Sequence, residues 1–213
     1  TLTALELLEG KDLNEQLTIS QSILNSVDIE ASVAGFRAGQ IVTLRDILYG
    51  IILPSGADAT AIMSEYLTGS ITGLVDEMNT LAQKIGMIDT RIMNTSGLDD
   101  PNQHTTLNDL LKLILYALEN EDFKEIYGTE KYRINAYDLE FENQILAGAN
   151  KKGFYFLEGA KSGYTDDANR ALSSVASHGN LSFIFISTQA EGDFYINNEA
   201  FNDAMKVYSY LFD

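Results

Sequence analysis

The first half of the chain carries hydrophobic residues at helical spacing. The clearest stretch follows Thr43, and its apolar side chains recur at i, i+3, i+4, i+7 and i+8: Leu44, Ile47, Leu48, Ile51 and Ile52. This pattern predicts an amphipathic helix with Thr43 as its N-cap. Pro54 disfavours the helical conformation in the residue before it, so we expect the helix to end there.

Three more helices are predicted before residue 120. One begins near Ser55–Ala59, where Ser55 itself is a plausible N-cap, and continues through Tyr66. The next is capped by Ser70 and closed by Gly86. A fourth begins at 106–109, with an expected inward face of Leu107, Leu110, Leu111, Ile114, Leu115 and Leu118. Residues 43–119 are therefore predicted to form a mostly helical lobe.

After about residue 130 the hydrophobic period shortens towards two, which indicates strands. We expect strands at 132–135, 154–158, 171–177 and 181–188, with the last two joined as a hairpin by the turn 177–180. A final helix has one apolar side: Phe201, Ala204, Met205, Tyr208 and Leu211. A helical lobe followed by an antiparallel sheet region at about 130–213 is an α+β plan, and we expect residues 1–213 to form a single domain.

Composition excludes several classes of function. The 213 residues contain 31 acidic and 14 basic side chains, a formal charge of −17, which argues against a nucleic-acid partner. There are no cysteines and two histidines, so we expect no metal site and no cofactor. No apolar run reaches the roughly 18 residues of a membrane span.

The start of the chain follows a helical pattern without a capping residue. Leu2, Leu5 and Leu8 share one face, and Gly10 suits the end of a helix. There is no initiator Met and no signal segment. We therefore expect this chain to be a fragment of a longer fold, attached to a membrane only through segments outside this sequence.

Two short segments carry residues suited to catalysis. Ser55-Gly56-Ala57 follows the proline break, and Lys161-Ser162-Gly163 enters the sheet region. A lysine beside a hydroxyl can hold a carboxylate by charge and hydrogen bond, and glycine lets a ligand backbone approach closely. Each segment alone is a weak signal.

In this order the two segments resemble the S-x-N and K-T-G motifs of penicillin-binding proteins and serine β-lactamases. Their surroundings narrow the match to the low-molecular-weight penicillin-binding proteins, the peptidase S11 type of serine D-alanyl-D-alanine carboxypeptidase. The resemblance covers essentially the whole chain, in the segments Thr1–Leu5, 43–50, 53–59, 94–100, 159–168 and 204–212. It implies a β-lactamase/transpeptidase-like fold, with an antiparallel sheet flanked by helices.

The resemblance also implies a reaction, a penicillin-sensitive acyl transfer that removes the terminal D-alanine from peptidoglycan stem peptides. Ser55 would relay a proton to the leaving amine, and Lys161 and Ser162 would bind the terminal carboxylate. Gly163 would admit the ligand backbone, and the N–H of Tyr164 would form half of the oxyanion hole. Partners would be stem peptides and β-lactams, and the location extracytoplasmic, in the cell envelope or secreted.

Two departures from the family pattern bear on activity. No serine is followed three residues later by lysine, so the S-x-x-K nucleophile and base are expected just before Thr1, and this chain alone is expected to be inactive. Ala57 stands where the family has asparagine, at a position that would contact substrate. The alternatives are a catalytically silent relative that binds cell-wall peptides, which Ala57 favours, and a serine β-lactamase, which needs a base for deacylation.

Three other residues are given structural interpretations. His104, near Asp99 and Asp100, is expected in a solvated loop rather than at a metal. His178 is expected to be exposed in its turn. Arg170 is interpreted as an ordinary surface arginine, with added positive charge near the carboxylate site as the alternative.

Overall fold

The computed structural model describes residues 1–191 and 198–212. Over these residues it is a mixed α+β structure with antiparallel sheets, as predicted. In chain order the elements are α1 (Leu2–Leu7), β1 (Gln16–Thr18), α2 (Gln21–Leu24), β2 (Ile41–Thr43), α3 (Leu44–Ile52), α4 (Ala57–Thr68), α5 (Ile71–Lys84), α6 (Leu107–Ala117), α7 (Glu121–Tyr127), β3 (Lys131–Ile134), a 3₁₀ turn (Asn135–Tyr137), β4 (Leu139–Glu142), α8 (Gln144–Lys151), β5 (Leu157–Thr165), β6 (Asn169–His178), β7 (Leu181–Ala190) and α9 (Glu199–Phe212).

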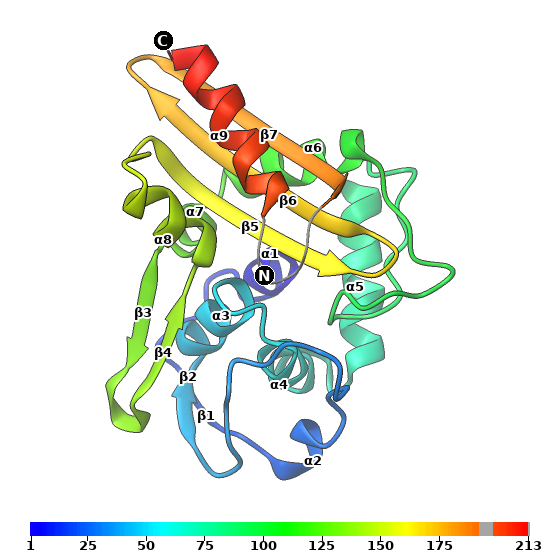
Figure 1. Ribbon diagram of the computed structural model, residues 1–213. Helices are drawn as coiled ribbons and strands as arrows, with labels where there is room; N and C mark the ends of the chain where they lie inside the picture. The colour runs from blue at the N-terminus through cyan, green and yellow to red at the C-terminus, as the bar shows by residue number, and fades with distance from the viewer. Residues whose placement is uncertain (192–197, 213) are drawn as a thin grey trace.

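The main sheet has the order β5-β6-β7, with both pairs antiparallel. α9 crosses one face of this sheet, and most of the other helices lie on its opposite side (Figure 1). His178 pairs with Leu181 across the turn between β6 and β7, which confirms the predicted hairpin. Within the described residues, no helix is both long and apolar enough to cross a membrane.

Side chains of β6 alternate between two hydrophobic cores. Leu172 and Ala176 pack with α8 and α9, whereas Val175 belongs to the core of the helical lobe. Ser174, also on β6, has its Oγ 3.0 Å from the hydroxyl of Tyr208 on α9. Because successive strand residues face opposite sides of a sheet, this alternation fixes which side chains meet each layer.

Sequence-predicted helix starts at Thr43 and Ser70 are confirmed. The Thr43 Oγ1 accepts from the Asp46 amide at 3.0 Å, and the Asp46 carboxylate accepts from the Thr43 amide at 2.8 Å. This reciprocal capping box gives hydrogen-bond acceptors to two backbone amides that have no acceptor within the helix. The Ser70 Oγ accepts from the Gly73 amide at 3.0 Å at the start of α5.

Ser55 is not an N-cap, and that prediction was wrong. Helix α4 begins at Ala57, and its N-cap is Gly56. Ser55 has φ +57°, in the left-handed region, whereas an N-cap residue adopts an extended conformation. The turn after Pro54 uses one more residue than the sequence pattern indicates, which leaves the Ser55 hydroxyl available for a different partner.

In the second half, one predicted strand has wrong bounds and two helices were missed. The strand expected at 154–158 is β5, which covers Leu157–Thr165 and contains the whole Lys161-Ser162-Gly163 motif. Its glycines and charges give it a weak strand pattern, so pairing with β6 rather than local propensity defines it. Helices α7 and α8 were not predicted, although Asn120 and Asn143 cap them.

The inward face of α6 differs from the prediction. Three of the leucines expected inside are exposed: Leu107, Leu111 and Leu115. The buried residues are Asp109, Ile114 and Ala117. The Asp109 carboxylate accepts from Lys112 and from the Thr90 hydroxyl, both at 2.8 Å, so hydrogen bonds allow a charged residue to occupy the buried face.

Candidate active site

Ser55 and Lys161 meet at the centre of the candidate site, although 106 residues separate them in sequence. Ser55 lies in the turn between α3 and α4, and Lys161 lies on β5. The Lys161 Nζ donates a hydrogen bond to Ser55 Oγ and another, at 2.6 Å, to the carbonyl oxygen of Ser162. The fold therefore brings together the two residues expected to be catalytic.

The Ser55 turn is held by contacts with the backbone on both sides. The Gly56 amide donates to the Gly50 carbonyl at 3.0 Å. The buried Asp58 carboxylate accepts from the amides of Ala34, Gly35 and Phe36 at 2.7, 2.8 and 3.0 Å. These bonds tie the loop before β2 to the start of α4 and fix the backbone on which Ser55 is displayed.

Ala57 is the first residue of α4 and is buried. Its amide donates to the Ser32 carbonyl at 2.8 Å, so the backbone here is fixed. Its methyl group has no donor or acceptor. The position expected to hold an asparagine side chain therefore offers the site no polar contact.

Burial lowers the pKa of the Lys161 ammonium from 10.5 to about 8. The cause is loss of hydration, which disfavours the charged form. A lysine that titrates near pH 8 can exchange a proton with its hydroxyl neighbour more readily than an exposed lysine. Behind it, Ser173 pairs with Lys161 across the two strands, and its Oγ lies 3.1 Å from the hydroxyl of the buried Tyr127.

This pKa makes stability depend on pH. Between about pH 8 and pH 10.5 the folded chain has lost the Lys161 proton while the unfolded chain keeps it, so the free energy of unfolding rises with pH in that window. Lys161→Met removes this contribution. Urea unfolding of both proteins at about pH 7 and about pH 9.5 should show wild type gaining stability relative to the variant. If the difference in the free energy of unfolding between wild type and variant is the same at both pH values, the lowered pKa of Lys161 is contradicted.

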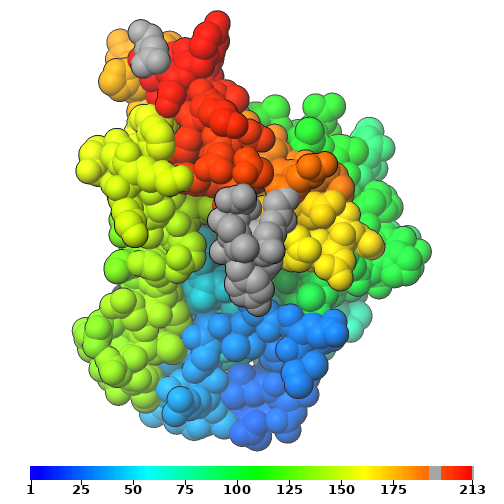
Figure 2. Space-filling model, viewed as in Figure 1, coloured from blue at the N-terminus to red at the C-terminus, as the bar shows by residue number. Residues whose placement is uncertain are grey.

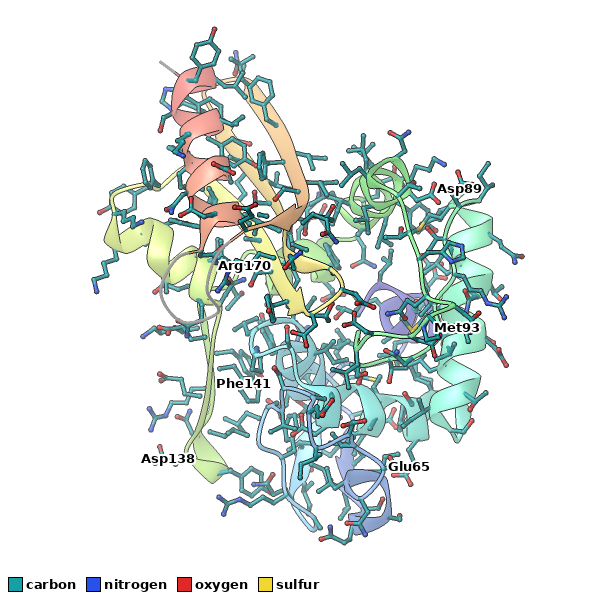
Figure 3. The ribbon with its side chains drawn as sticks, turned by 45° about the vertical axis from the view of Figure 1, so that its right-hand side comes forward. Glu65, Asp89, Met93, Asp138, Phe141 and Arg170 are labelled. Carbon is teal, nitrogen blue, oxygen red and sulfur yellow. The ribbon has the colours of Figure 1, made fainter. Side chains whose placement is uncertain are left out.

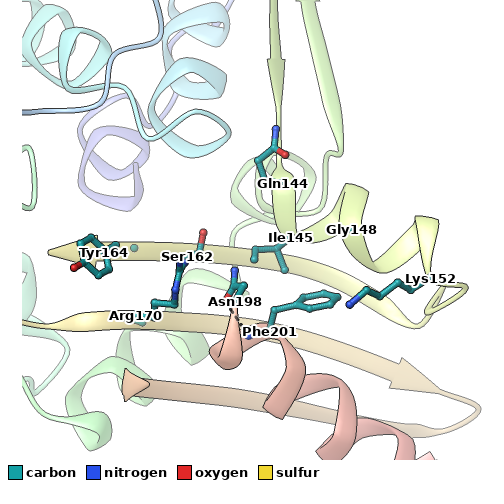
Figure 4. A pocket seen from close by; sticks show the side chains of 11 residues that line it. Gln144, Ile145, Gly148, Lys152, Ser162, Tyr164, Arg170, Asn198 and Phe201 are labelled. Atoms are coloured by element: carbon teal, nitrogen blue, oxygen red, sulfur yellow. Dashed lines mark hydrogen bonds between the residues drawn. The ribbon is translucent and has the colours of Figure 1, made fainter. Parts of the chain in front are cut away.

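Ser162, Gly163 and Tyr164 line a pocket of about 410 Å³ bounded by α8, the sheet and α9 (Figure 4). Arg170 on β6 lines it too, with its guanidinium carbon 5.8 Å from the centre of the Tyr164 ring. Arg170 is 8% exposed. Its interpretation as a surface arginine was wrong, because its position on β6 directs it to the α8 and α9 side of the sheet.

Neither histidine belongs to this site. His104 is exposed and exchanges backbone hydrogen bonds with Arg91. His178 is exposed, as predicted, and its ring lies 5.6 Å from that of Phe212. Within residues 1–191 and 198–212, no group of three or more His, Cys, Asp and Glu side chains is placed to hold a metal ion.

Sequence reasoning missed Asn143, which supports β5 beside Lys161. Its buried Nδ2 donates to the Ala160 carbonyl at 2.8 Å, while its Oδ1 accepts from the amides of Ile145 and Leu146 at the start of α8. One side chain thus joins the N-terminus of α8 to the strand that carries Lys161. An asparagine directly before an apolar helical pattern was the available signal.

The first residue of the chain lies against α4. Thr1, Thr60 and Thr95 line a small cavity of about 90 Å³, and Thr60 Oγ1 donates to the Ala57 carbonyl at 2.9 Å. The beginning of α1 is therefore close to the first turn of the helix that follows Ser55.

Comparison with protein families gives a match over most of the chain. A family model described as D-alanyl-D-alanine carboxypeptidase, peptidase S11, matches residues 2–192. The D-alanyl-D-alanine carboxypeptidase DacF of Bacillus subtilis is 28% identical over 192 residues, covering 87% of this chain and 48% of the relative. The DacD enzyme of Escherichia coli is 28% identical over 168 residues, 78% of this chain and 42% of its own length. The chain spans about half the length of these relatives.

Solved structures share the fold. The Streptomyces K15 DD-transpeptidase has a TM-score of 0.82 at 23% identity, with 98% of this chain and 84% of that chain covered. Penicillin-binding protein 6B of Escherichia coli has a TM-score of 0.83 at 23% identity, with 98% and 66% covered. The predicted β-lactamase/transpeptidase-like fold is therefore confirmed.

Proposed function

The chain belongs to the D-alanyl-D-alanine carboxypeptidase family, peptidase S11, and we propose that the protein containing it removes the terminal D-alanine from peptidoglycan stem peptides through an acyl-enzyme. The observation that carries this proposal is the contact of Lys161 Nζ with Ser55 Oγ. This hydrogen bond joins one residue from each of the two motifs that are expected to act together in this family. The site of action would be extracytoplasmic, where peptidoglycan is found, and β-lactams would acylate the same enzyme.

In the proposed reaction, a serine oxygen attacks the carbonyl between the two D-alanines while a lysine takes its proton. The C–N bond then breaks, and Ser55 passes a proton to the leaving amine with Lys161 as its neighbour. The Tyr164 amide would donate to the developing oxyanion. Water attacks the resulting ester, which releases the shortened peptide and restores the serine.

The attacking serine and its lysine would come from residues that precede Thr1 in a longer protein. Residues 1–213 contain no S-x-x-K sequence. In support of this proposal, Thr1 lines the same cavity as Thr60, which lies about one turn after Ala57 on α4. Residues that directly precede Thr1 would therefore begin close to the Ser55 turn. We call the chain together with these preceding residues the extended protein.

Hydrolysis of a peptide ending in D-alanyl-D-alanine tests the proposed function. The extended protein should release one D-alanine per peptide and be blocked by penicillin, whereas residues 1–213 alone should release none. Release of the penultimate residue, or activity that penicillin does not block, would contradict the proposal. Fast decay of the penicilloyl adduct would instead indicate a β-lactamase.

The methyl group at position 57 favours a second candidate, a silent relative that binds cell-wall peptides without cleaving them. If Ala57 only weakens the enzyme, Ala57→Asn should restore a hydrogen bond worth about 1–3 kcal/mol and speed penicillin acylation of the extended protein about 10-fold. Ala38→Asn, at an exposed position, is the control. Acylation that is absent in wild type and present in Ala57→Asn would identify the natural protein as the silent relative.

A further inference from the structure

Ser55 has a backbone conformation that a residue with a side chain seldom adopts. Its φ of +57° lies in the left-handed region, where the Cβ atom crowds the following carbonyl oxygen. In this conformation its Oγ accepts the hydrogen bond from Lys161 Nζ. Strained backbone of this kind persists only where the surrounding structure enforces it. Contacts around the turn must therefore hold Ser55 in place.

The segment 34–36 packs against both sides of this turn. A Cβ at Gly56 would lie 2.8 Å from the Ala34 methyl group and 2.6 Å from the Gly50 carbonyl oxygen. A Cβ at Gly50 would lie 2.7 Å from the Phe36 ring. Because the Gly56 amide also donates to the Gly50 carbonyl at 3.0 Å, the segment 34–36 holds the turn against the end of α3.

The Asp58 carboxylate in turn holds the segment 34–36. Its Oδ1 accepts from the Ala34 amide at 2.7 Å, and its Oδ2 accepts from the amides of Gly35 and Phe36 at 2.8 and 3.0 Å. Gly35 has φ +95°, which lets successive amides point to one carboxylate. Asp58 is 3% exposed, so little water competes for its oxygens.

The segment 34–36 belongs to the part of the chain that faces the end of β5. Figures 1 and 2 show the blue chain between α2 and β2 below the yellow end of β5. Among the described residues, each hydrogen bond to the Asp58 carboxylate comes from a backbone amide. Its influence on Ser55 therefore passes through the segment 34–36 and Gly56.

We propose that Asp58 is a positioning residue for Ser55. Its carboxylate holds the segment 34–36 against Gly56. This packing keeps Ser55 in the left-handed conformation that places its hydroxyl at Lys161. The assignment rests on the proposed function, in which Ser55 passes a proton to the leaving amine. Asp58 acts through the backbone and not on a reacting atom.

Asp58→Asn in the extended protein tests the assignment. The variant keeps the size of the side chain but replaces one accepting oxygen by a donor, which would face backbone amides that also donate. Penicillin acylation should slow by about 10- to 100-fold, because a displacement of about 1 Å can cost about 10²-fold in rate. The penicillin concentration that gives half the maximal rate should change less than about threefold, since binding is kept. If folded Asp58→Asn is acylated at the wild-type rate, the assignment is wrong.

Asp109→Asn is the matched control, because Asp109 is also a buried aspartate that accepts a backbone hydrogen bond. It is 1% exposed and accepts from the Asp89 amide at 2.9 Å. Asp89 is well separated from Phe141, whose ring lies 5.7 Å from that of Phe36 (Figure 3). The control should lose stability and keep the wild-type acylation rate. Equal slowing in both variants would mean that acylation responds to stability alone, and would overturn the assignment.

Gly35→Ala reports on the same contacts if Asp58→Asn does not fold. Alanine is strained at φ +95°, so the amide of residue 35 is drawn away from the Asp58 carboxylate. Gly39→Ala introduces similar strain on the same loop, at φ +82°, but the Gly39 amide donates to the Ile19 carbonyl. Gly35→Ala should slow acylation about 10-fold and Gly39→Ala should leave it unchanged. Equal rates for these two variants would contradict the assignment.

Nuclear magnetic resonance of residues 1–213 separates failure of the assignment from failure of the proposed function. Burial lowers the pKa of Lys161 to about 8. Release of Ser55 in Asp58→Asn should hydrate the ammonium and raise this pKa towards 10.5, whereas Asp109→Asn should leave it unchanged. The same pKa in Asp58→Asn and wild type would contradict the assignment. If the wild-type extended protein is not acylated, the proposed function fails, and the pKa of Lys161 alone decides whether Asp58 positions Ser55.

Discussion

Replacing Lys161 by methionine is expected to slow penicillin acylation of the extended protein by about 10²- to 10⁴-fold. The variant removes the ammonium that donates to Ser55 Oγ while keeping a side chain of similar length. Without it, the Ser55 hydroxyl loses the neighbour that holds its orientation and exchanges its proton. Acylation is followed by stopped-flow kinetics with a fluorescent penicillin.

Lys206→Met is the matched control for this variant. Lys206 lies on the exposed side of α9 in an ion pair with Asp203, away from the pocket lining. Its replacement makes the same change in charge and should leave the acylation rate unchanged. Equal rates for Lys161→Met and wild type, with both proteins folded, would remove Lys161 from the mechanism.

Gly159→Ala is expected to have the largest effect on stability, a loss of about 3 kcal/mol. A Cβ at Gly159 would lie 2.1 Å from the Tyr127 ring, closer than any real contact. Tyr127 is buried and its hydroxyl contacts Ser173, so the ring cannot move without breaking packing against β5. Urea unfolding followed by circular dichroism measures the change.

Gly163→Ala tests whether the effect comes from the contact rather than from the loss of a strand glycine. Gly163 lies four residues along the same strand, and a Cβ there would meet no atom within 4 Å. This variant should keep wild-type stability. If the two alanine variants unfold at the same urea concentration, close packing of Gly159 on Tyr127 does not stabilise the fold.

The sequence was most informative where local patterns agree with tertiary contacts. Thr43 is followed by apolar residues at helical spacing and by Asp46, and the structure has a complete capping box there. The β6–β7 hairpin was predictable for the same reason, since strand residues and the turn at Gly179 point to one structure. Such elements need no information from distant parts of the chain.

The strand that carries Lys161 shows the limit of this reasoning. β5 holds Gly159, Lys161 and Gly163, which lower its strand propensity, and it is defined by eight register pairs with β6. The face of α6 was mispredicted for a related reason. A buried Asp109 is tolerated because groups distant in sequence donate hydrogen bonds to it, and hydrophobicity alone cannot indicate this.

Ser55 and Lys161 were predicted as site residues from the sequence. Neither of the two short segments that contain them indicates that the two side chains are in contact. Arg170 was wrongly predicted to be exposed, because a charged side chain alone suggests a surface position. Its burial follows from its place opposite Tyr164, on the side of β6 that faces α8 and α9, and only the strand register shows this.

The prediction that residues 1–213 form a single domain remains to be tested, as do the roles of Ser55, Ala57, Lys161, Ser162, Gly163 and Tyr164. The family match covers residues 2–192, and the chain spans about half the length of its relatives. Catalytic roles must therefore be measured on the extended protein.

The central claim is that this chain supplies Ser55 and Lys161 to an active site whose nucleophile precedes Thr1. The most direct test is the intact mass of the protein before and after incubation with penicillin. The 23.5 kDa chain should gain no adduct, and the extended protein should gain one penicillin. An adduct on the 23.5 kDa chain itself would contradict the account and make Ser55 the nucleophile to test.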